Sequence, residues 1–268
     1  MATTFEHILT HTTEAGVRVI TLNRPEKLNA VNRALAHEFP TAVQEASEDE
    51  SVRSVLITGA GRGFCAGLEL DPSQIASLSK SATRAHKIDD LEWVGRWVLA
   101  LRACPVPVVA AINGPAAGAG FAMTLAADIR VMSEAAVMTP GYARIAASPD
   151  AGMTWLLPRI VGAARATELI LSARDIKHEE AVRIGLVAAA MPADGFADAA
   201  LAYATRLAQG PTIAYIHTKR LLNQAFDVDL TTQLKAELSL IKQCFATDDS
   251  REAIRAFGEK RKPNFQGK

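Results

Sequence analysis

The stretch from Val108 to Arg130, VVAAINGPAAGAGFAMTLAADIR, limits the folds this chain can adopt more than any other. A run of β-branched and small apolar residues stops at Asn113-Gly114-Pro115. Five small residues follow, Ala116 to Gly120, and then a helix-favouring segment from Phe121 to Ala127. This order predicts a buried strand, a tight turn and the start of a helix. The free N–H groups in the first turn of such a helix suit an oxygen that gains negative charge. The alternative is that the small residues only allow the helix to pack closely on the strand.

A second stretch has the same order of features. Ser54 to Gly59 predicts a buried strand, and Ala60 to Leu70 follows as a loop rich in glycine and alanine. One such loop offers one or two free amides, whereas two adjacent loops can direct amides at a single oxygen from both sides. The pair therefore favours an anion-stabilising site over simple packing.

Five segments resemble the crotonase superfamily, which contains enoyl-CoA hydratases and isomerases. They are Asn23–Ala30, Gly63–Gly67, Ala111–Gly118, Pro149–Gly152 and Glu259–Phe265. The resemblance implies an α/β crotonase fold, a superhelical core of repeated ββα units over residues 1–195. It also implies that a helical C-terminal region, residues 196–268, joins the chains into a homotrimer or homohexamer.

Composition limits the partners and the setting. Lys and Arg number 29, as do Asp and Glu, so the formal charge is zero and we expect no nucleic-acid partner. No apolar run approaches a membrane span, and the N-terminus lacks the features of a signal peptide. The 3 cysteines are scattered and the histidines show no metal-ligand spacing. We therefore expect a cytoplasmic enzyme with no membrane partner and no metal.

The remaining elements can be predicted from periodicity and turn residues. Their predicted ranges are a hairpin from 6–11 and 17–22, helices at 33–48, 91–101 and 153–160, a strand at 128–132, and an almost wholly helical chain from 163 except at 186–191. The polar start of residues 71–103 is typical of a substrate-shaping lid.

The resemblance assigns two backbone amides to the reaction, those of Leu68 and Ala119. In the family such amides polarise the thioester carbonyl of an acyl-CoA and stabilise the enolate that forms from it. Only the N–H group is used, so an alanine serves if its φ is negative. The alternative for both residues is simple packing.

The acid–base residues depart from the hydratase pattern. A hydratase of the family carries glutamates at the positions that Ala122 and Tyr142 occupy here. Asp150, in Ser-Pro-Asp-Ala-Gly, matches the aspartate that shuttles the proton in some isomerases of the family. The alternative is that Asp150 caps the following helix. We expect a dry, apolar pocket around it, with Tyr142 packing on the acyl chain or donating a hydrogen bond.

The resemblance also indicates where coenzyme A binds. Arg24, Lys27, Leu28 and Ala30 match the loop around adenine and the phosphates, and Lys260 matches a basic residue that often comes from the next subunit. Ala66 and Leu70 match positions that contact the rest of the substrate. No separate cofactor is expected, because coenzyme A is part of the substrate.

The sequence therefore predicts an enzyme that acts on an acyl-CoA thioester, most simply by moving a double bond with Asp150 as the proton shuttle. Hydration of an enoyl-CoA is the first alternative, with a lid residue between His86 and Glu92 sharing the work. Other possibilities are Asp150 as a nucleophile, for which no histidine base is well placed, and a non-catalytic acyl-CoA binder.

Overall fold

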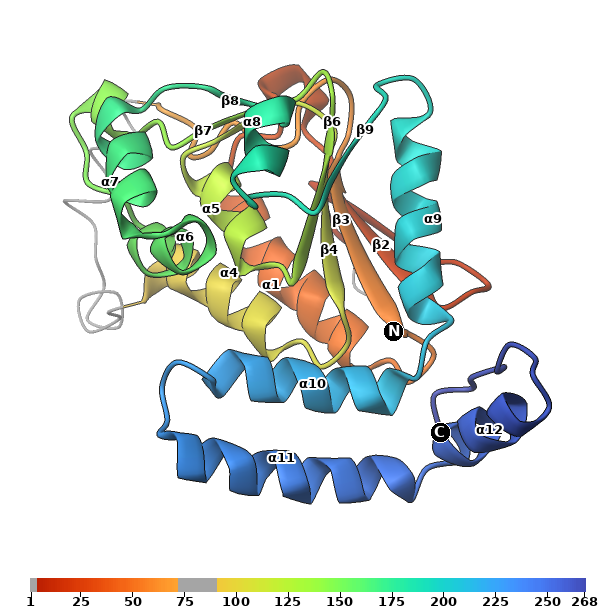
Figure 1. Ribbon diagram of the computed structural model, residues 1–268. Helices are drawn as coiled ribbons and strands as arrows, with labels where there is room; N and C mark the ends of the chain where they lie inside the picture. The colour runs from red at the N-terminus through yellow and green to blue at the C-terminus, as the bar shows by residue number, and fades with distance from the viewer. Residues whose placement is uncertain (1–3, 72–90) are drawn as a thin grey trace, which may run out of the picture.

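The computed structural model describes residues 4–71 and 91–268, and a six-stranded sheet forms its centre (Figure 1). The strand order is β1-β2-β3-β4-β6-β9. The bounds are β1 Ile8–Thr12, β2 Val17–Leu22, β3 Ser54–Gly59, β4 Val108–Ile112, β6 Ile129–Ser133 and β9 Ala189–Met191. The β1–β2 pair is antiparallel, which confirms the predicted hairpin, and every other pair in this sheet is parallel.

Helices cover both faces of the sheet, so the central strand β4 is apolar and buried along its whole length. On one face lie α1 (Arg33–Glu48), α4 (Glu92–Ala103) and α5 (Ala119–Ala126), and on the other lies α9 (Phe196–Ala208). Successive side chains of β3 point to opposite faces of the sheet, so they divide between the two cores. Val55 and Ile57 pack with the first group of helices, and Leu56 packs with α9.

Helix α1 has the bounds predicted from its periodicity. It begins after Asn32, whose side-chain oxygen accepts a hydrogen bond from Leu35 N at 2.9 Å. Leu35, Phe39 and Val43 are fully buried against the sheet. The spacing of these side chains places them on one face of the helix.

A second, small sheet was not predicted. It has the order β5-β7-β8, with bounds Ala116–Ala117, Val137–Thr139 and Ile176–Lys177. Strands of two or three residues are too short to show a period-two pattern, so the sequence around β5 suggested only a turn. This sheet matters for function because β5 and β7 end beside the candidate site.

Apart from η1, which lies near the N-terminus, the remaining helices confirm that the C-terminal half is mostly helical. They are η1 Pro25–Lys27, η2 Tyr142–Ile145, α6 Met153–Val161, α7 Ala163–Ser172, α8 His178–Arg183, α10 Thr212–Gln224, α11 Leu230–Phe245 and α12 Asp248–Gly258. Helices α10 and α11 pack together across one end of the sheet, and α12 lies beyond them (Figure 1). Helix α9 packs against the sheet and belongs to the core rather than to this C-terminal group of helices. In the described part of the chain no helix is long and apolar enough to span a membrane.

Candidate active site

Two loops lie side by side at the carboxyl ends of β3 and β4. Phe64 N and Cys65 N both donate hydrogen bonds of 3.1 Å to the carbonyl of Pro115, and Ala117 N donates one of 2.9 Å to the carbonyl of Cys65. An isolated parallel bridge between Cys65 and Ala116 continues the contact. The two glycine- and alanine-rich segments are therefore one structural unit.

The glycines explain how the loops come so close. A Cβ atom on Gly120 would lie 2.2 Å from the carbonyl oxygen of Cys65, and one on Gly114 would lie 2.1 Å from that of Arg62. Both distances are shorter than any real contact, so these glycines serve loop packing. Gly67 has a φ of +88°, and a Cβ atom there would lie 2.7 Å from Ala117 O and 3.5 Å from Ala119 N. The chain at Gly67 therefore passes directly beside the start of α5.

The amides of Leu68 and Ala119 are available to a ligand. Hydrogen bonds on either side of Leu68 fix its backbone, from Val31 N to Gly67 O at 2.8 Å and from Glu69 N to Val31 O at 2.9 Å. Ala119 is the first residue of α5, where the helix supplies no acceptor for the N–H group. Across residues 4–71 and 91–268, neither amide donates a hydrogen bond within the chain. The fold thus offers two donors on adjacent loops, as an oxyanion requires.

Two asparagines hold the first loop, a role that the sequence pattern alone does not indicate. Asn113 donates from Nδ2 to the carbonyls of Gly59 and Gly61 at 2.9 and 3.1 Å, and its Oδ1 accepts from Gly59 N. Asn29 is fully buried and donates to the carbonyls of Ala60 and Gly63 at 3.0 and 2.8 Å. Both lie within the motifs quoted above, but only the folded loop shows which carbonyls they bind.

Asp150 accepts a hydrogen bond of 2.6 Å at Oδ1 from the hydroxyl of Tyr142. The alternative role of Asp150 as a helix cap is wrong, because α6 is preceded by Gly152 and has no side-chain cap. Asp150 is exposed in the single chain, not enclosed in a dry, apolar pocket as expected. Tyr142 is buried, and burial together with the adjacent carboxylate raises the pKa of its hydroxyl. The tyrosine therefore remains a protonated donor to Asp150.

The Tyr142 segment packs against the loop that carries Ala119. Strands β5 and β7 pair in parallel with Ala117 opposite Thr139, and Gly118 N donates to Thr139 O at 3.1 Å. A Cβ atom on Gly141 would lie 3.4 Å from Gly118 N. Ala119 thus follows the carboxyl end of β5, and Tyr142 follows the carboxyl end of the neighbouring strand β7.

The residues predicted to bind coenzyme A form a second group beside the first loop. Arg24 is buried, and its Nη2 lies 2.9 Å from Glu69 Oε2, while Lys27 Nζ lies 3.5 Å from Glu69 Oε1. Leu28 accepts from Ala66 N at its carbonyl, and Arg24 donates to the carbonyl of Ala30. The structure therefore brings Arg24, Lys27, Leu28, Ala30 and Ala66 together, with the charge of Arg24 already paired.

Two further predicted positions, Leu70 and Lys260, are exposed in the single chain. Leu70 follows the first loop and is 53% exposed. Lys260 follows α12 and is exposed, apart from the loops within one chain. Of the proposed lid residues, His86, Asp89 and Asp90 lie outside the described residues.

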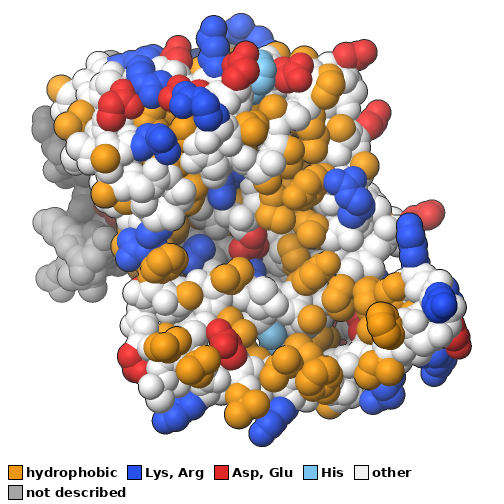
Figure 2. Space-filling view, in the orientation of Figure 1, with side chains coloured by type: hydrophobic (Ala, Val, Ile, Leu, Met, Phe, Trp, Pro, Cys, Tyr) orange, Lys and Arg blue, Asp and Glu red, His pale blue; other side chains and the backbone are white. Residues whose placement is uncertain are grey.

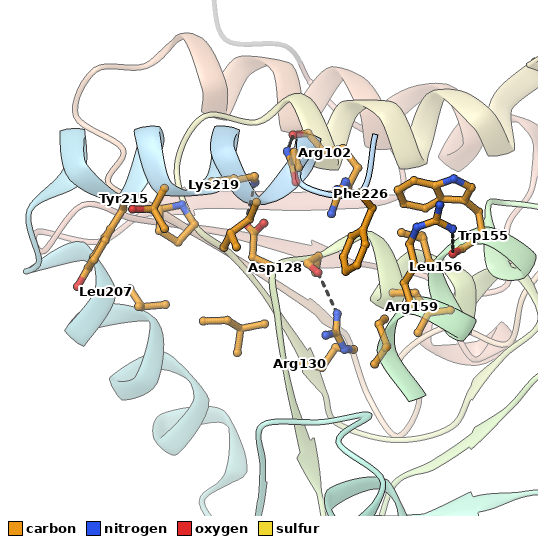
Figure 3. Close-up of a pocket in the computed structure, with 18 residues that line it drawn as sticks. Arg102, Asp128, Arg130, Trp155, Leu156, Arg159, Leu207, Tyr215, Lys219 and Phe226 are labelled. Carbon is orange, nitrogen blue, oxygen red and sulfur yellow. Dashed lines mark hydrogen bonds and ion pairs between the residues drawn. The ribbon is translucent and has the colours of Figure 1, made fainter. Parts of the chain in front are cut away.

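A groove of about 540 Å³ lies at the opposite end of the sheet (Figure 3). Pro107 and Asp128, which precede β4 and β6, line it together with α6 and α10. Its buried lysine, Lys219, is paired with Asp128 at 2.7 Å. Because ligands of parallel sheets bind at the carboxyl ends of strands, we place the active site at the loops and not in this groove.

Other chemistry has little support from the described residues. They contain no cluster of three or more His, Cys, Asp or Glu side chains able to hold a metal ion. Cys65 lies in the first loop, but its complete burial raises the pKa of the thiol to about 12. A thiol this hard to ionise is a poor nucleophile.

Comparisons with known proteins point to one family. The family described as enoyl-CoA hydratase/isomerase matches residues 12–268. A Rhodobacter capsulatus protein named "Probable enoyl-CoA hydratase" is 38% identical over 98% of this chain and 99% of its own. The 1,2-epoxyphenylacetyl-CoA isomerase of Escherichia coli is 35% identical over 98% of this chain and 99% of its own.

A solved structure gives the same result for the fold. The enoyl-CoA hydratase from Polaromonas sp. JS666 superposes with a TM-score of 0.88 at 32% identity, covering 97% of this chain and 99% of that one. The architecture and the paired loops define an α/β enzyme of the crotonase fold. The chain belongs to the enoyl-CoA hydratase/isomerase family.

Proposed function

We propose that the protein isomerises an acyl-CoA thioester by moving a double bond, with Asp150 as the proton shuttle. The observation that carries the proposal is the hydrogen bond of 2.6 Å from Tyr142 to Asp150 Oδ1. It leaves Oδ2 of the same carboxylate with no hydrogen-bond partner among the described residues. One oxygen is thus fixed and the other is available to take a proton.

The amides of Leu68 and Ala119 would hold the thioester oxygen. Removing a proton from carbon next to a thioester forms an enolate, in which the carbonyl oxygen carries the negative charge. Preorganised N–H donors stabilise that charge more than they stabilise the neutral carbonyl, so they lower the barrier. The same contact also orients the substrate relative to Asp150.

The proton balance needs only one carboxylate. Asp150 takes a proton from one carbon of the acyl chain, the C–H electron pair enters the enolate system, and the double bond moves. The protonated Asp150 then returns the proton to the carbon two positions away, and the carboxylate is restored. No water is consumed, and Tyr142 keeps its hydrogen bond to Asp150 throughout.

Isomerisation fits the residues better than hydration does. Hydration normally divides the activation of water and the delivery of a proton between two carboxylates. Ala122, which is completely buried, and Tyr142 occupy the positions where hydratases of the family carry glutamates. The relative named as an epoxyphenylacetyl-CoA isomerase supports the same choice, and the relative named as a hydratase supports the alternative.

The decisive experiment is a panel of 2-enoyl-CoA and 3-enoyl-CoA esters, assayed by chromatography and mass spectrometry. Migration of the double bond and addition of water give products of different mass. We expect migration to predominate with the wild type. Asp150→Asn should lower turnover roughly 10²–10⁴-fold, the usual value of general acid–base catalysis.

Asp194→Asn is the matched control, because Asp194 is exposed in the turn before α9. This variant should retain wild-type turnover. Full activity of Asp150→Asn would overturn the role of Asp150. Efficient hydration by the wild type would favour the alternative, and binding of the esters with no turnover across the panel would favour a non-catalytic binder.

A further inference from the structure

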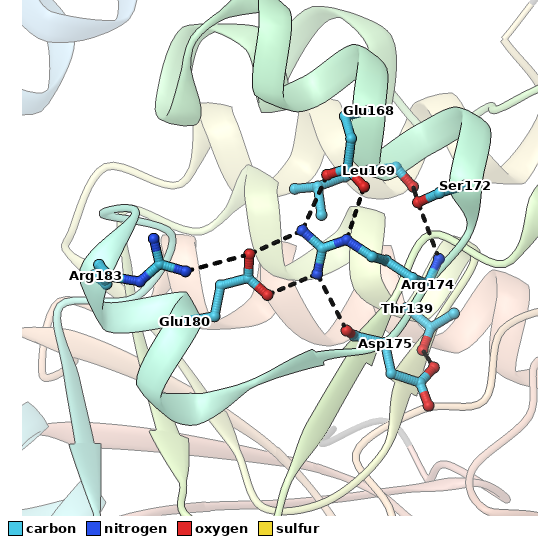
Figure 4. A network of polar contacts seen from close by, with 8 residues as sticks. All are labelled: Thr139, Glu168, Leu169, Ser172, Arg174, Asp175, Glu180 and Arg183. Carbon is cyan, nitrogen blue, oxygen red and sulfur yellow. Dashed lines mark hydrogen bonds and ion pairs between the residues drawn. The ribbon is translucent and has the colours of Figure 1, made fainter.

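A single carboxylate oxygen holds the chain on both sides of Tyr142. Oδ1 of Asp175 accepts hydrogen bonds from Thr139 Oγ1 at 2.6 Å and from Arg144 Nη2 at 2.8 Å. Thr139 is the last residue of β7, before Tyr142, and Arg144 lies within η2, after it. Figure 4 shows the contact with Thr139. The tyrosine is therefore bracketed by two side chains that bind the same atom.

The bracketed segment needs such an anchor. Its two ends are left-handed, with φ values of +79° at Gly141 and +56° at Ala146. Residues 143–148 are exposed, so the apolar core holds only Tyr142 itself. Arg144 also donates a hydrogen bond of 2.9 Å from Nε to the carbonyl of Ala173. This bond joins η2 to the segment that carries Asp175.

Asp175 is itself fixed from both directions. The residue before it, Arg174, bonds to both oxygens of Glu168 in α7 and to both oxygens of Glu180 in α8 (Figure 4). The residue after it, Ile176, pairs with Met138 of β7. The residues on either side of Asp175 are therefore held by contacts with α7, α8 and β7, so the carboxylate that anchors the Tyr142 segment has a fixed position.

We propose that Asp175 is a positioning residue that sets the geometry of the Tyr142–Asp150 pair. The inference rests on the proposed function of that pair. Asp175 does not touch the reacting atoms in this scheme. It holds β7 and η2 so that the Tyr142 hydroxyl meets Asp150, and an error of about 1 Å at such a site can reduce turnover substantially.

A purely stabilising surface ion pair is the alternative. The side chains of Arg144 and Asp175 are 53% and 55% exposed, and ion pairs this exposed contribute little to stability. Loss of the Asp175 carboxylate should therefore leave the fold intact while releasing η2. An intact fold with reduced turnover would therefore distinguish a positioning role from a stabilising one.

The first test uses Asp175→Ala and Asp175→Asn with the enoyl-CoA ester that the wild type turns over fastest. We expect Asp175→Ala to lower kcat about five- to tenfold with KM unchanged within about twofold. Asp175→Asn keeps an acceptor oxygen and should recover most of kcat. In a Tyr142→Phe background, Asp175→Ala should have almost no further effect, because both changes act through one hydroxyl.

Glu168→Ala is the matched control, since it removes a partner of Arg174 and leaves every bond to η2 in place. This variant should keep wild-type kcat. An unchanged kcat for Asp175→Ala would overturn the inference, and so would an equal loss in the presence and absence of the Tyr142 hydroxyl. Loss of activity in Asp150→Asn alongside an unaffected Asp175→Ala would refute only the positioning role.

A second measurement does not depend on activity. Ala147 N donates to Tyr142 O at 3.1 Å, so amide exchange at Ala147 reports the order of η2. Hydrogen exchange followed by mass spectrometry should show faster exchange in residues 140–150 of Asp175→Ala, with α7 and α8 unchanged. Equal exchange in the two proteins would show that Asp175 does not hold this segment.

Discussion

Lys219 of α10 reaches into the end of the sheet and contacts Asp128 Oδ2 at 2.7 Å. The same ammonium donates to the carbonyls of Leu101 and Val106 at 3.2 and 3.3 Å. Asp128 in turn accepts from Val108 N at 2.8 Å. One buried lysine therefore connects α10 to the end of α4 and to the residues that come just before β4 and β6.

We predict that Lys219→Met destabilises the protein by roughly 3 kcal/mol, because it leaves a largely buried carboxylate without its counter-charge. Urea unfolding followed by circular dichroism would measure the change. Lys242→Met, at an exposed position of α11, is the control and should change the free energy of unfolding by less than about 0.5 kcal/mol. Equal stabilities of the two variants would contradict the prediction.

The parts of the fold that could be predicted depend on local patterns. Helix α1 and the β1–β2 hairpin follow from periodicity and turn residues, and the apolar runs of β3 and β4 follow from burial on both faces. The small sheet could not be predicted in this way. Its strands are held by pairing between distant segments rather than by any pattern of their own.

The candidate site shows the same division. The motifs could point to Leu68 and Ala119 as candidates, because backbone amides depend on loop shape and not on side-chain chemistry. The bond from Tyr142 to Asp150 could not, because it depends on how η2 turns between two left-handed residues. The pairing of Arg24 with Glu69 also required the folded loop, since it joins two motifs that are separate in the sequence.

Replacing the Ala119 amide tests the oxyanion site. Ala119→Pro removes the N–H at the first position of α5, where a helix tolerates proline. We expect turnover to fall by about 10²–10³-fold, because loss of one such donor raises the barrier by about 2.7–4 kcal/mol. Steady-state kinetics on a folded variant, checked by circular dichroism, would show it.

The control for this change is Ala163→Pro, which places proline at the first position of α7. It makes the same chemical change at an exposed helix start and should leave kcat unaltered. If Ala119→Pro folded and kept wild-type kcat, the thioester oxygen would have to bind elsewhere.

Tyr142→Phe should lower kcat by about tenfold and leave the fold unchanged. The hydroxyl is the donor that orients Asp150, and its loss frees an exposed carboxylate to rotate. Kinetics with the best enoyl-CoA ester would measure the effect. Tyr203→Phe, on α9 at the other face of the sheet, should have no effect. A similar kcat for both variants would mean that the hydroxyl does not assist Asp150.

Glu69 predicts a pH dependence of stability. Its hydrogen bond with Arg24, followed by the charges of Arg24 and Lys27, holds the pKa of the carboxyl below its usual value. A folded-state pKa lower than the unfolded one stabilises the protein above about pH 4.3. That contribution is lost as the pH falls through the folded-state value.

We therefore expect the stability of Glu69→Gln to depend less on pH than that of the wild type between about pH 5 and 3. Urea unfolding at a series of pH values would measure both curves. Glu14→Gln, at an exposed position in the β1–β2 turn, should follow the wild type. Parallel curves for wild type and Glu69→Gln would show that folding does not lower the pKa of the Glu69 carboxyl.

The exposed apolar face of the C-terminal helices predicts self-association. Figure 2 shows hydrophobic side chains gathered over α11 and α12. The exposed members along α11 are Leu230, Leu234, Leu238, Ile241 and Phe245. A patch this extended is unusual on a monomer, so we predict the homotrimer or homohexamer that the family resemblance implies.

Sedimentation velocity at micromolar concentration would give the mass of the assembly. Leu234→Glu combined with Leu238→Glu should shift it toward the monomer, because two carboxylates would have to be buried in the interface. Ala202→Glu, at an exposed site on α9, should leave the mass unchanged. A wild-type monomer would exclude the assembly, and an intact oligomer of the double variant would place its interface away from α11.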